Sequence, residues 1–384
     1  MKKRFYLLMA IVGIFLGLFS VKVVEVLGDK NYTMIQVREN AGEEIIKETP
    51  IDVEKVVGFT EETEEFQNLS ISLIGDILMD GSVKTYINKN GFNYPWDNVR
   101  EYFQNDDITI GNLETSITNK GTKWPNKQFN FRSNPKNIKA MEEAGVDIVS
   151  LSNNHSLDYG YDGLIDTLKH IDNSKIKRVG AGYNKKDAIK GTIVERNGIT
   201  VGVLGFSRVV PDVKWYASGK RAGLVGAYDP HVQEVLDRVK EMKEEVDILV
   251  LAIHWGVERS DTPRKQEMDL AKKLVDSGVD IVMGHHPHVL QGIEIYKGKP
   301  IFYSLGNFVF GTSSELTSNT MIAQVNLVEK NIDNIKIIPC EIVHGRPVPL
   351  HKEKRIAKIN YLYKISKNFG TNIDENGLIK IVKE

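Results

Sequence analysis

The residues best suited to chemistry are histidines, carboxylates and asparagines that recur in short motifs along the chain. The densest motif is Gly284-His285-His286-Pro287-His288, which holds three of the chain's nine histidines. On an extended segment, side chains two positions apart share a face, so the imidazoles of His286 and His288 can turn toward one cation. This motif therefore predicts a pair of nitrogen ligands for a metal ion.

Other potential ligands stand in separate motifs, Gly75-Asp76, Asn112-Leu113-Glu114, Asn153-Asn154-His155 and His254-Trp255-Gly256. Taken singly, a residue such as Asp76 is more simply interpreted as a turn former or a helix cap. Taken together, carboxylate, amide and imidazole donors are a mixture that binds Zn, Mn or Fe ions. We expect two divalent ions, one anchored by Asp76 and both bridged by Glu114. The remaining expected ligands are Asn154, His254, His286 and His288.

A pair of divalent ions defines the expected chemistry. Two ions a few ångströms apart polarise a phosphoryl oxygen and convert a bound water into hydroxide at neutral pH. His155 follows the expected ligand Asn154 and is not itself needed as a ligand. We therefore expect His155 to be the catalytic residue that protonates a leaving oxygen or stabilises developing charge.

Each motif stands at or just beyond the end of a predicted strand. Runs of β-branched residues predict strands over residues 70–74, 108–111, 148–152, 200–206, 248–254, 281–284 and 300–305. Helical patterns fall at residues 134–144, 163–173, 230–245 and 264–277. Strands that alternate with helices of this length predict an α/β layered fold. Because side chains at strand ends converge on one rim of such a fold, the motifs are expected to meet there.

The composition excludes several other kinds of site. The 50 Lys and Arg residues balance the 51 Asp and Glu residues, so the net charge of -1 gives no global basic field for binding nucleic acid. Cys340 is the single cysteine of the sequence, which excludes an internal disulfide and a zinc–cysteine cluster. A metal ion must then be held by histidine, carboxylate and amide side chains.

The start of the chain predicts a membrane anchor. Basic residues 2–4 precede a run of about 20 mostly apolar residues, enough to cross roughly 30 Å of hydrocarbon. The basic cluster stays on the inner side, so the bulk of the chain is expected to be extracellular, at the cell membrane. A cleaved signal peptide has a similar start, but no convincing small-x-small cleavage site follows the run, which favours an uncleaved anchor.

The rest of the chain, after the anchor, divides into a stalk, a domain and a tail. We assign residues 1–28 to the anchor, the acidic residues 29–68 to a solvated stalk and residues 69–346 to the domain that carries the motifs. Residues 347–384 form a Lys-rich tail with scattered apolar positions, which we expect to be a helix packed on the domain or on a partner.

Over about residues 70–345 the chain resembles the CapA/PgsA family of poly-γ-glutamate capsule proteins. The resemblance rests on the motifs above and on Asp158-Tyr159-Gly160, Gly180-Ala181-Gly182-Tyr183, Leu204-Gly205-Phe206-Ser207 and Tyr303-Ser304-Leu305-Gly306-Asn307-Phe308, all in family order. It implies a membrane-bound accessory subunit of the capsule polymerase of Gram-positive bacteria. The implied partners are the anionic polymer and the membrane subunits of the polyglutamate synthase or exporter.

That family is similar to the calcineurin-like metallophosphoesterases, so the resemblance implies a four-layer αββα sandwich. Asp76 matches the first aspartate of those enzymes, and Glu114 stands where many relatives have a bridging aspartate. The Asn-His pair is Asn154-His155, the isolated histidine is His254, and the closing pair is His286 and His288.

One position departs from that pattern. The histidine usually found two positions after the first aspartate is Leu78 here, so one ion lacks a typical ligand. His285 is a spare histidine, expected either to support the inner ligands or to face the substrate.

Four further residues are candidates for contact with substrate or with the inner ligands. Lys127 and Arg132 carry charges that suit an anionic substrate, although a solvated basic hairpin accounts for them equally well. Tyr159 and Asn307 offer polar groups within the family motifs.

Three functions are open at this point. The first is a membrane-anchored extracellular component of poly-γ-glutamate synthesis or export whose metal site binds or processes the polymer. The second is a surface metal-dependent phosphoesterase, and the third is a non-enzymatic scaffold for polymerase subunits. Leu78 leaves hydrolase activity undecided, and a mixed donor set does not choose among Mn, Zn and Fe.

Overall fold

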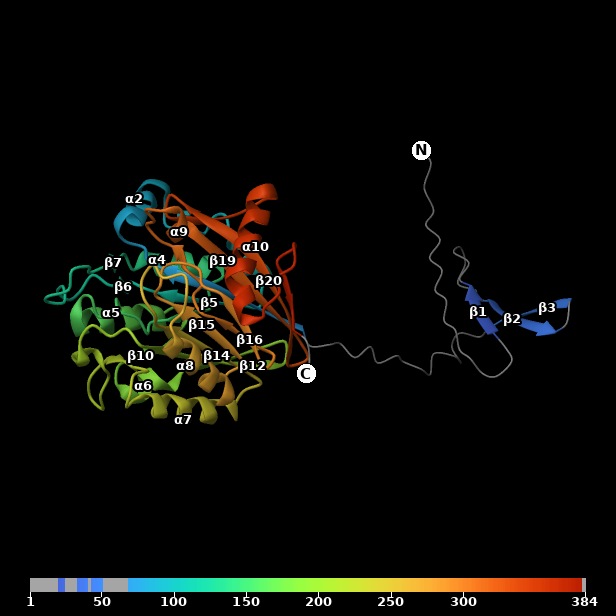
Figure 1. The fold of residues 1–384 in the computed structure, drawn as a ribbon, viewed down its shortest axis with the longest axis horizontal. Helices are drawn as coiled ribbons and strands as arrows, with labels where there is room; N and C mark the ends of the chain where they lie inside the picture. Colours follow the sequence, from blue (N-terminus) through green and yellow to red (C-terminus); the bar gives the residue numbers. More distant parts are fainter. Residues whose placement is uncertain (1–19, 25–32, 41–42, 51–67, 382–384) are drawn as a thin grey trace. The chain divides into compact units, whose positions relative to one another are not determined.

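The computed structural model describes residues 20–24, 33–40, 43–50 and 68–381 (Figure 1). The chain divides into two units, Met1–Glu65 and Phe66–Glu384. The first unit contains an antiparallel sheet of β1 (Ser20–Val24), β2 (Thr33–Asn40) and β3 (Glu43–Pro50). Strand β1 thus takes up residues that we expected in a membrane helix, and a hairpin occupies part of the expected stalk.

The rest of the expected anchor, residues 1–19 and 25–28, lies outside the described residues. Among the helices that the structure describes, none is both long and apolar enough to cross a membrane. Alternating Thr33, Ile35 and Val37 give β2 the β-branched pattern of a strand, a signal that the acidic composition of the segment obscured.

The second unit is built on two mixed sheets. The larger has the strand order β21-β20-β19-β4-β5-β8-β9, with β18 beside β4 and β22 beside β20. Its strands are β4 (Asn68–Ile77), β5 (Ile108–Leu113), β8 (Ile148–Ser150), β9 (Lys177–Val179), β18 (Asn307–Val309), β19 (Asn319–Val328), β20 (Asn331–Val343), β21 (Arg346–Pro349) and β22 (Leu378–Lys380).

The smaller sheet has the order β11-β12-β14-β15-β17-β16. Its strands are β11 (Thr192–Arg196), β12 (Ile199–Ser207), β14 (Ile248–His254), β15 (Ile281–His285), β16 (Ile293–Tyr296) and β17 (Lys299–Phe302). Short pairs are formed by β6 (Ser116–Ile117) with β7 (Arg132–Ser133) and by β10 (Ala181–Gly182) with β13 (Gly223–Leu224).

Helices cover the outer faces of both sheets (Figure 1). The α-helices of this unit are α2 (Gly81–Asn90), α3 (Arg100–Asn105), α4 (Lys136–Ala144), α5 (Gly160–Asp172), α6 (Lys185–Lys190), α7 (Val232–Lys243), α8 (Lys265–Asp276), α9 (Glu315–Ser318) and α10 (Lys352–Ser366). Short 3-10 turns span Tyr94–Trp96, Val213–Trp215 and Lys367–Phe369.

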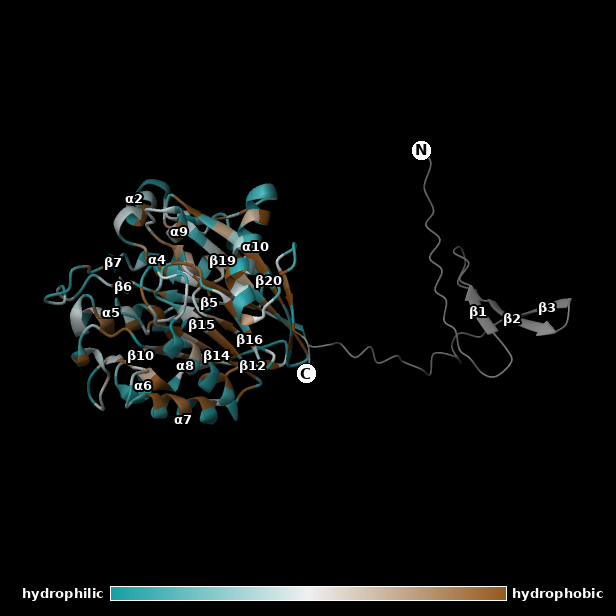
Figure 2. Cartoon of the chain, in the orientation of Figure 1, coloured by the Kyte–Doolittle hydropathy of each residue, from teal (hydrophilic) through white to brown (hydrophobic). Residues whose placement is uncertain are grey.

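Three buried apolar clusters define the layers. The first contains Leu73 of β4 and Val250 of β14, and therefore fills the space between the two sheets. The second joins the larger sheet to helices α2, α4 and α5, and the third joins the smaller sheet to α6, α7 and α8. Figure 2 shows hydrophobic strands inside and helices with a hydrophilic outer side. The prediction of an α/β fold with sheets and covering helices is confirmed.

The expected boundary after residue 346 does not separate two parts of the structure. Strand β21 begins at Arg346 and pairs with β20, and β22 adds a further strand to the same sheet. Helix α10 packs through Ile359 and Leu362 into the cluster between the sheets. The tail therefore completes the domain.

Two glycines allow the chain to pass closely at the strand ends that carry the candidate ligands. A Cβ atom at Gly75 would lie 2.1 Å from the carbonyl oxygen of Gly306, and one at Gly284 would lie 2.1 Å from that of Tyr303. Both obstacles are backbone atoms, so a side chain cannot be accommodated by a rotamer change.

We expect Gly75→Ala to lower the free energy of unfolding by about 1–3 kcal/mol, because the added methyl group forces the backbone near Gly306 to move. Gly219→Ala is the matched control, since a Cβ there meets no described atom within 4 Å. Urea denaturation of the full chain measures both variants. Equal stabilities of the two variants would contradict the close approach at Gly75.

Candidate metal centre

The parallel strands of both sheets bring the motif residues to one rim. In the larger sheet, β4 and β5 run parallel with Asp76 opposite Asn112. In the smaller sheet, β14 and β15 run parallel with His254 opposite His285. Strand β15 also contacts β4, so the rims of the two sheets meet. The expected convergence of the motifs is therefore what the structure shows.

Two carboxylates lie among the imidazoles at this rim. Asp76 has Oδ1 3.2 Å from His285 Nδ1 and Oδ2 3.2 Å from His288 Nδ1. Glu114 Oε1 lies 3.4 Å from His254 Nε2 and 3.9 Å from His288 Nε2. The carboxylate oxygens and imidazole nitrogens therefore lie close together at this point of the rim.

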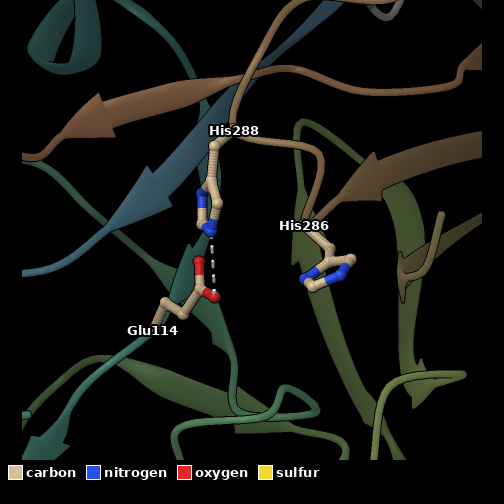
Figure 3. A group of neighbouring side chains, drawn as sticks. All are labelled: Glu114, His286 and His288. Atoms are coloured by element: carbon tan, nitrogen blue, oxygen red, sulfur yellow. Dashed lines mark ion pairs between the residues drawn. The ribbon is translucent and has the colours of Figure 1, made fainter. Parts of the chain in front are cut away.

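Asn154 and His286 complete the set. The Oδ1 atom of Asn154 is 2.8 Å from His254 Nε2. The ligand atoms of His286, His288 and Glu114 lie within 4.8 Å of one another, as do those of Asp76, Glu114 and His254. Figure 3 shows the first of these groups, with the Glu114 carboxylate beside His288 and His286. Glu114 belongs to both groups, the position expected for a residue that would bridge two ions.

The segment that carries His286 and His288 is not extended, so the argument that placed both on one face of a strand was wrong. Both residues have positive φ, 97° for His286 and 58° for His288, in the left-handed region that non-glycine residues rarely adopt. Hydrogen bonds from Arg259 N to Pro287 O, at 2.7 Å, and from Trp255 N to His285 O, at 3.0 Å, hold the loop. Such a backbone costs of order 1–3 kcal/mol per residue and is typical of functional sites.

The cluster is buried and poorly satisfied by protein groups. Asp76 and Glu114 are fully buried, and His254, His285 and His286 are nearly so. Within residues 68–381, Asp76 Oδ2, both Glu114 oxygens and His286 Nδ1 have no hydrogen-bond partner. Buried polar atoms of this kind normally find partners, because an unpaired one is costly.

The ionisation of the cluster reflects this burial. Burial raises the pKa of Glu114 well above its ordinary value, and the negative charge of Asp76 raises it further. Burial also raises the pKa of Asp76, but contacts with His285 and His288 outweigh it and hold that pKa well below the ordinary value. Burial and the positive field of His288 lower the pKa of His286 to about 3. Burial, with His286, lowers the pKa of His254 well below its ordinary value.

These properties fit divalent cations. Neutral imidazoles present the lone pairs that a metal requires, and a cation restores the ionised form of Glu114 that burial disfavours. A mixed set of carboxylate, amide and imidazole donors suits Mn, Zn or Fe. The residues that could hold two ions are Asp76, Glu114, Asn154, His254, His286 and His288.

Two asparagines that the sequence argument left without a role support the Asp76 carboxylate. Asn153 Nδ2 donates to Asn112 Oδ1 at 3.1 Å, which orients the Asn112 amide so that its Nδ2 donates to Asp76 Oδ1 at 2.9 Å. Both asparagines are fully buried. Both lie in motifs that the sequence showed, Asn112-Leu113-Glu114 and Asn153-Asn154-His155. An amide side chain at the end of a buried strand could have indicated this supporting role.

Asn307 sets the tautomer of His288. Its Nδ2 donates to the carbonyl oxygens of His288, at 3.1 Å, and Thr317, at 3.0 Å. Its Oδ1 therefore faces His288 Nδ1, 2.9 Å away, and accepts the proton on that nitrogen. The lone pair of His288 then lies on Nε2, the atom nearer Glu114. Asn307 thus orients the candidate ligand His288.

His155 is held beside the cluster by Asp158, a third residue without an assigned role in the sequence argument. His155 Nδ1 lies 2.7 Å from Asp158 Oδ2, and His155 Nε2 lies 4.0 Å from Glu114 Oε1. Lys127 Nζ is 2.6 Å from Asp158 Oδ1. Burial lowers the pKa of His155, although Asp158 opposes the shift. The motif Asp158-Tyr159-Gly160 contained this partner.

Arg132 and Tyr159 are engaged with each other instead of with the cluster. The guanidinium of Arg132 donates to the carbonyl oxygens of Lys120 and Gly121, both at 3.0 Å, and its carbon lies 3.5 Å from the ring centre of Tyr159. None of their described contacts reaches a candidate ligand. Contact of these two residues with substrate stays a prediction.

The fold and the cluster together define an α/β protein with a candidate metal centre at the carboxyl ends of its parallel strands. The family described as "Bacterial capsule synthesis protein PGA_cap" matches residues 70–312, and the chain belongs to this family. The match confirms the resemblance that the ordered motifs predicted.

Similar curated proteins carry related names. The "PGA biosynthesis protein CapA" of Bacillus subtilis is 33% identical over 314 residues, which cover 81% of each chain. The "Capsule biosynthesis protein CapA" of Bacillus anthracis is 33% identical over 74% of this chain and 70% of its own. A "Probable polyglutamine synthesis accessory protein" of Mycobacterium tuberculosis is 29% identical over 73% of this chain and 78% of its own.

We expect Asn307→Ala to weaken the binding of Mn or Zn by about 10- to 100-fold, because His288 loses the acceptor that fixes its tautomer. Isothermal titration of the chelator-treated full chain measures the affinity. Asn90→Ala is the control, because Asn90 is exposed at the end of α2 and donates only to Tyr86 O among its described contacts. An unchanged affinity in Asn307→Ala would contradict the role assigned to Asn307.

Proposed function

We propose that this protein, which takes part in capsule poly-γ-glutamate biosynthesis, uses a two-metal centre to bind or process the anionic polymer. The observation that carries the proposal is the environment of Glu114. Its carboxylate is fully buried, and none of the residues described in the structure donates a hydrogen bond to either oxygen. Imidazole nitrogens of His254 and His288 lie within 4 Å of Oε1.

Different residues of the chain would bind the ions and transfer protons. Asp76, Glu114, Asn154, His254, His286 and His288 would hold the ions. Bound ions would supply positive charge that attracts carboxylates of the polymer and a Lewis acid that activates water. Asp158 accepts a hydrogen bond from His155 Nδ1, so that His155 Nε2 faces Glu114. At Nε2 the imidazole can give or take a proton. Lys127 forms an ion pair with Asp158 and balances its negative charge.

The proposal includes placement at the cell membrane. The basic start and the apolar run support a single membrane anchor with the domain outside the cell. Partners there would be the polymer and the membrane subunits of the polyglutamate synthase or exporter.

Kinship with calcineurin-like metallophosphoesterases is part of the proposal. Two sheets with one buried cluster between them, and further clusters that join each sheet to its helices, support a four-layer αββα sandwich. The matched ligand positions Asp76, Asn154 and His254 support the same kinship.

In a strain that makes cell-associated poly-γ-glutamate, we expect Glu114→Gln to reduce the polymer to the level of a deletion strain. The amide keeps the size of the side chain but removes the charge that would bridge two cations. Quantification of cell-bound and released polymer is the measurement, with protein amount checked by immunoblot. His351→Ala is the control, because His351 is exposed at the start of α10.

Normal polymer in the Glu114→Gln strain would contradict the role of the centre and favour a scaffold.

The second candidate is a surface phosphoesterase, favoured by the contact of His155 with Asp158 beside the cluster. On this proposal the purified chain with Mn or Zn hydrolyses an aryl phosphate ester. His155→Ala is then expected to lower kcat by about 10²–10⁴-fold, because protonation of the leaving oxygen is lost. Identical rates for the wild type and His155→Ala would count against a phosphoesterase that uses His155.

A further inference from the structure

We propose that His285 is itself a metal ligand and gives the ion anchored by Asp76 the imidazole that Leu78 cannot provide. The inference rests on the two-metal centre proposed above and deepens it. Neither the donor chemistry nor the family pattern placed His285 among the ligands.

The position of His285 suits this role. It is the last residue of β15, pairs in register with His254 of β14 and is 1% exposed. Its Nδ1 lies 3.2 Å from Asp76 Oδ1. Two donors bonded to one ion at 2.0–2.2 Å stand about 3–3.5 Å apart. The separation of these two atoms is within that range.

The bonding state of His285 favours the same assignment. Neither Nδ1 nor Nε2 has a hydrogen-bond partner among residues 68–381. A buried imidazole with a purely structural role normally donates or accepts through at least one nitrogen, because the loss of both bonds is costly. Coordination of a cation by one nitrogen removes most of that cost.

Leu78 occupies the position of the usual histidine ligand, so the ion beside Asp76 needs a nitrogen from another residue. Leu78 follows the last residue of β4, is buried and offers no donor atom. It belongs to none of the three core clusters found in the described part of the chain. The missing nitrogen can be supplied from the facing sheet, because β15 contacts β4 at this rim.

A different role for His285 is to orient Asp76 by a hydrogen bond. Asp76 Oδ1 already accepts a hydrogen bond from Asn112 Nδ2 at 2.9 Å. The contact between His285 and Asp76 is close, yet its angles do not meet those of a hydrogen bond. A ring aimed in this way is better explained by a shared cation than by donation to the carboxylate.

The test counts metal ions bound to the full chain. The chelator-treated protein is saturated with Mn or Zn, freed of excess ion and analysed by inductively coupled plasma mass spectrometry. We expect two ions per wild-type chain and one ion per chain in both His285→Ala and His285→Gln. Gln retains a hydrogen-bond donor but is a poor ligand, so it separates coordination from orientation. Circular dichroism verifies folding, and the Gln variant decides the question if the Ala variant unfolds.

Rescue provides a second readout. In the double variant Leu78→His with His285→Ala, we expect the count to return to two, because a histidine at position 78 restores the usual ligand. His170→Ala is the matched control and should retain two ions, since His170 lies on α5 and pairs with Asp166.

Two outcomes would overturn the inference in distinguishable ways. Two ions in either folded His285 variant, with affinity unchanged from the wild type, would remove His285 from the ligands and leave the proposed centre intact. A wild-type chain that retains neither Mn nor Zn would overturn both the centre and the role of His285.

Discussion

The rest of the site depends on one constraint, the burial of the Glu114 carboxylate among imidazoles without a hydrogen-bond donor from the described residues. A negative charge in such a place is stable only beside a positive charge. Burial lowers the pKa values of His254 and His286, which favours the neutral imidazoles that can bind a metal. We propose that a metal ion meets the requirement.

That arrangement is produced by the fold. Parallel pairs in both sheets end at the same rim, and close passages at Gly75 and Gly284 let the strand ends approach the loop that follows β17. Inside the rim, Asn112 and Asn307 fix the orientation of Asp76 and His288 through amides whose own hydrogen bonds leave one possible orientation. Separate backbone hydrogen bonds, from Arg259 N to Pro287 O and from Trp255 N to His285 O, hold the loop in which His286 and His288 have positive φ.

The sequence predicted those strands and helices whose residues show a local pattern. Strand β14, Ile248–His254, has the bounds that its apolar run predicted, and the candidate ligands were selected because each stands at or just beyond the end of such a run. Sequence reasoning did not find β19 and β20, although these strands form a hairpin across Glu329 and Lys330. The pairing of β19 with β4, a strand far away in the sequence, has no local signal. The support from Asn112 likewise depends on its position opposite Asp76. The left-handed backbone at His286 has no local sequence signal, because only tertiary contacts make it tolerable.

The proposed two-metal centre connects the family's link to an anionic polymer with the geometry of this chain. Its most direct test is anomalous X-ray scattering from crystals of protein purified without chelators, recorded at the Mn, Fe and Zn absorption edges. The account predicts two anomalous peaks that flank the Glu114 carboxylate, one beside Asp76 and the other beside His286. Crystals grown at neutral pH with added Mn or Zn that still give no peak within bonding distance of Glu114 would contradict it.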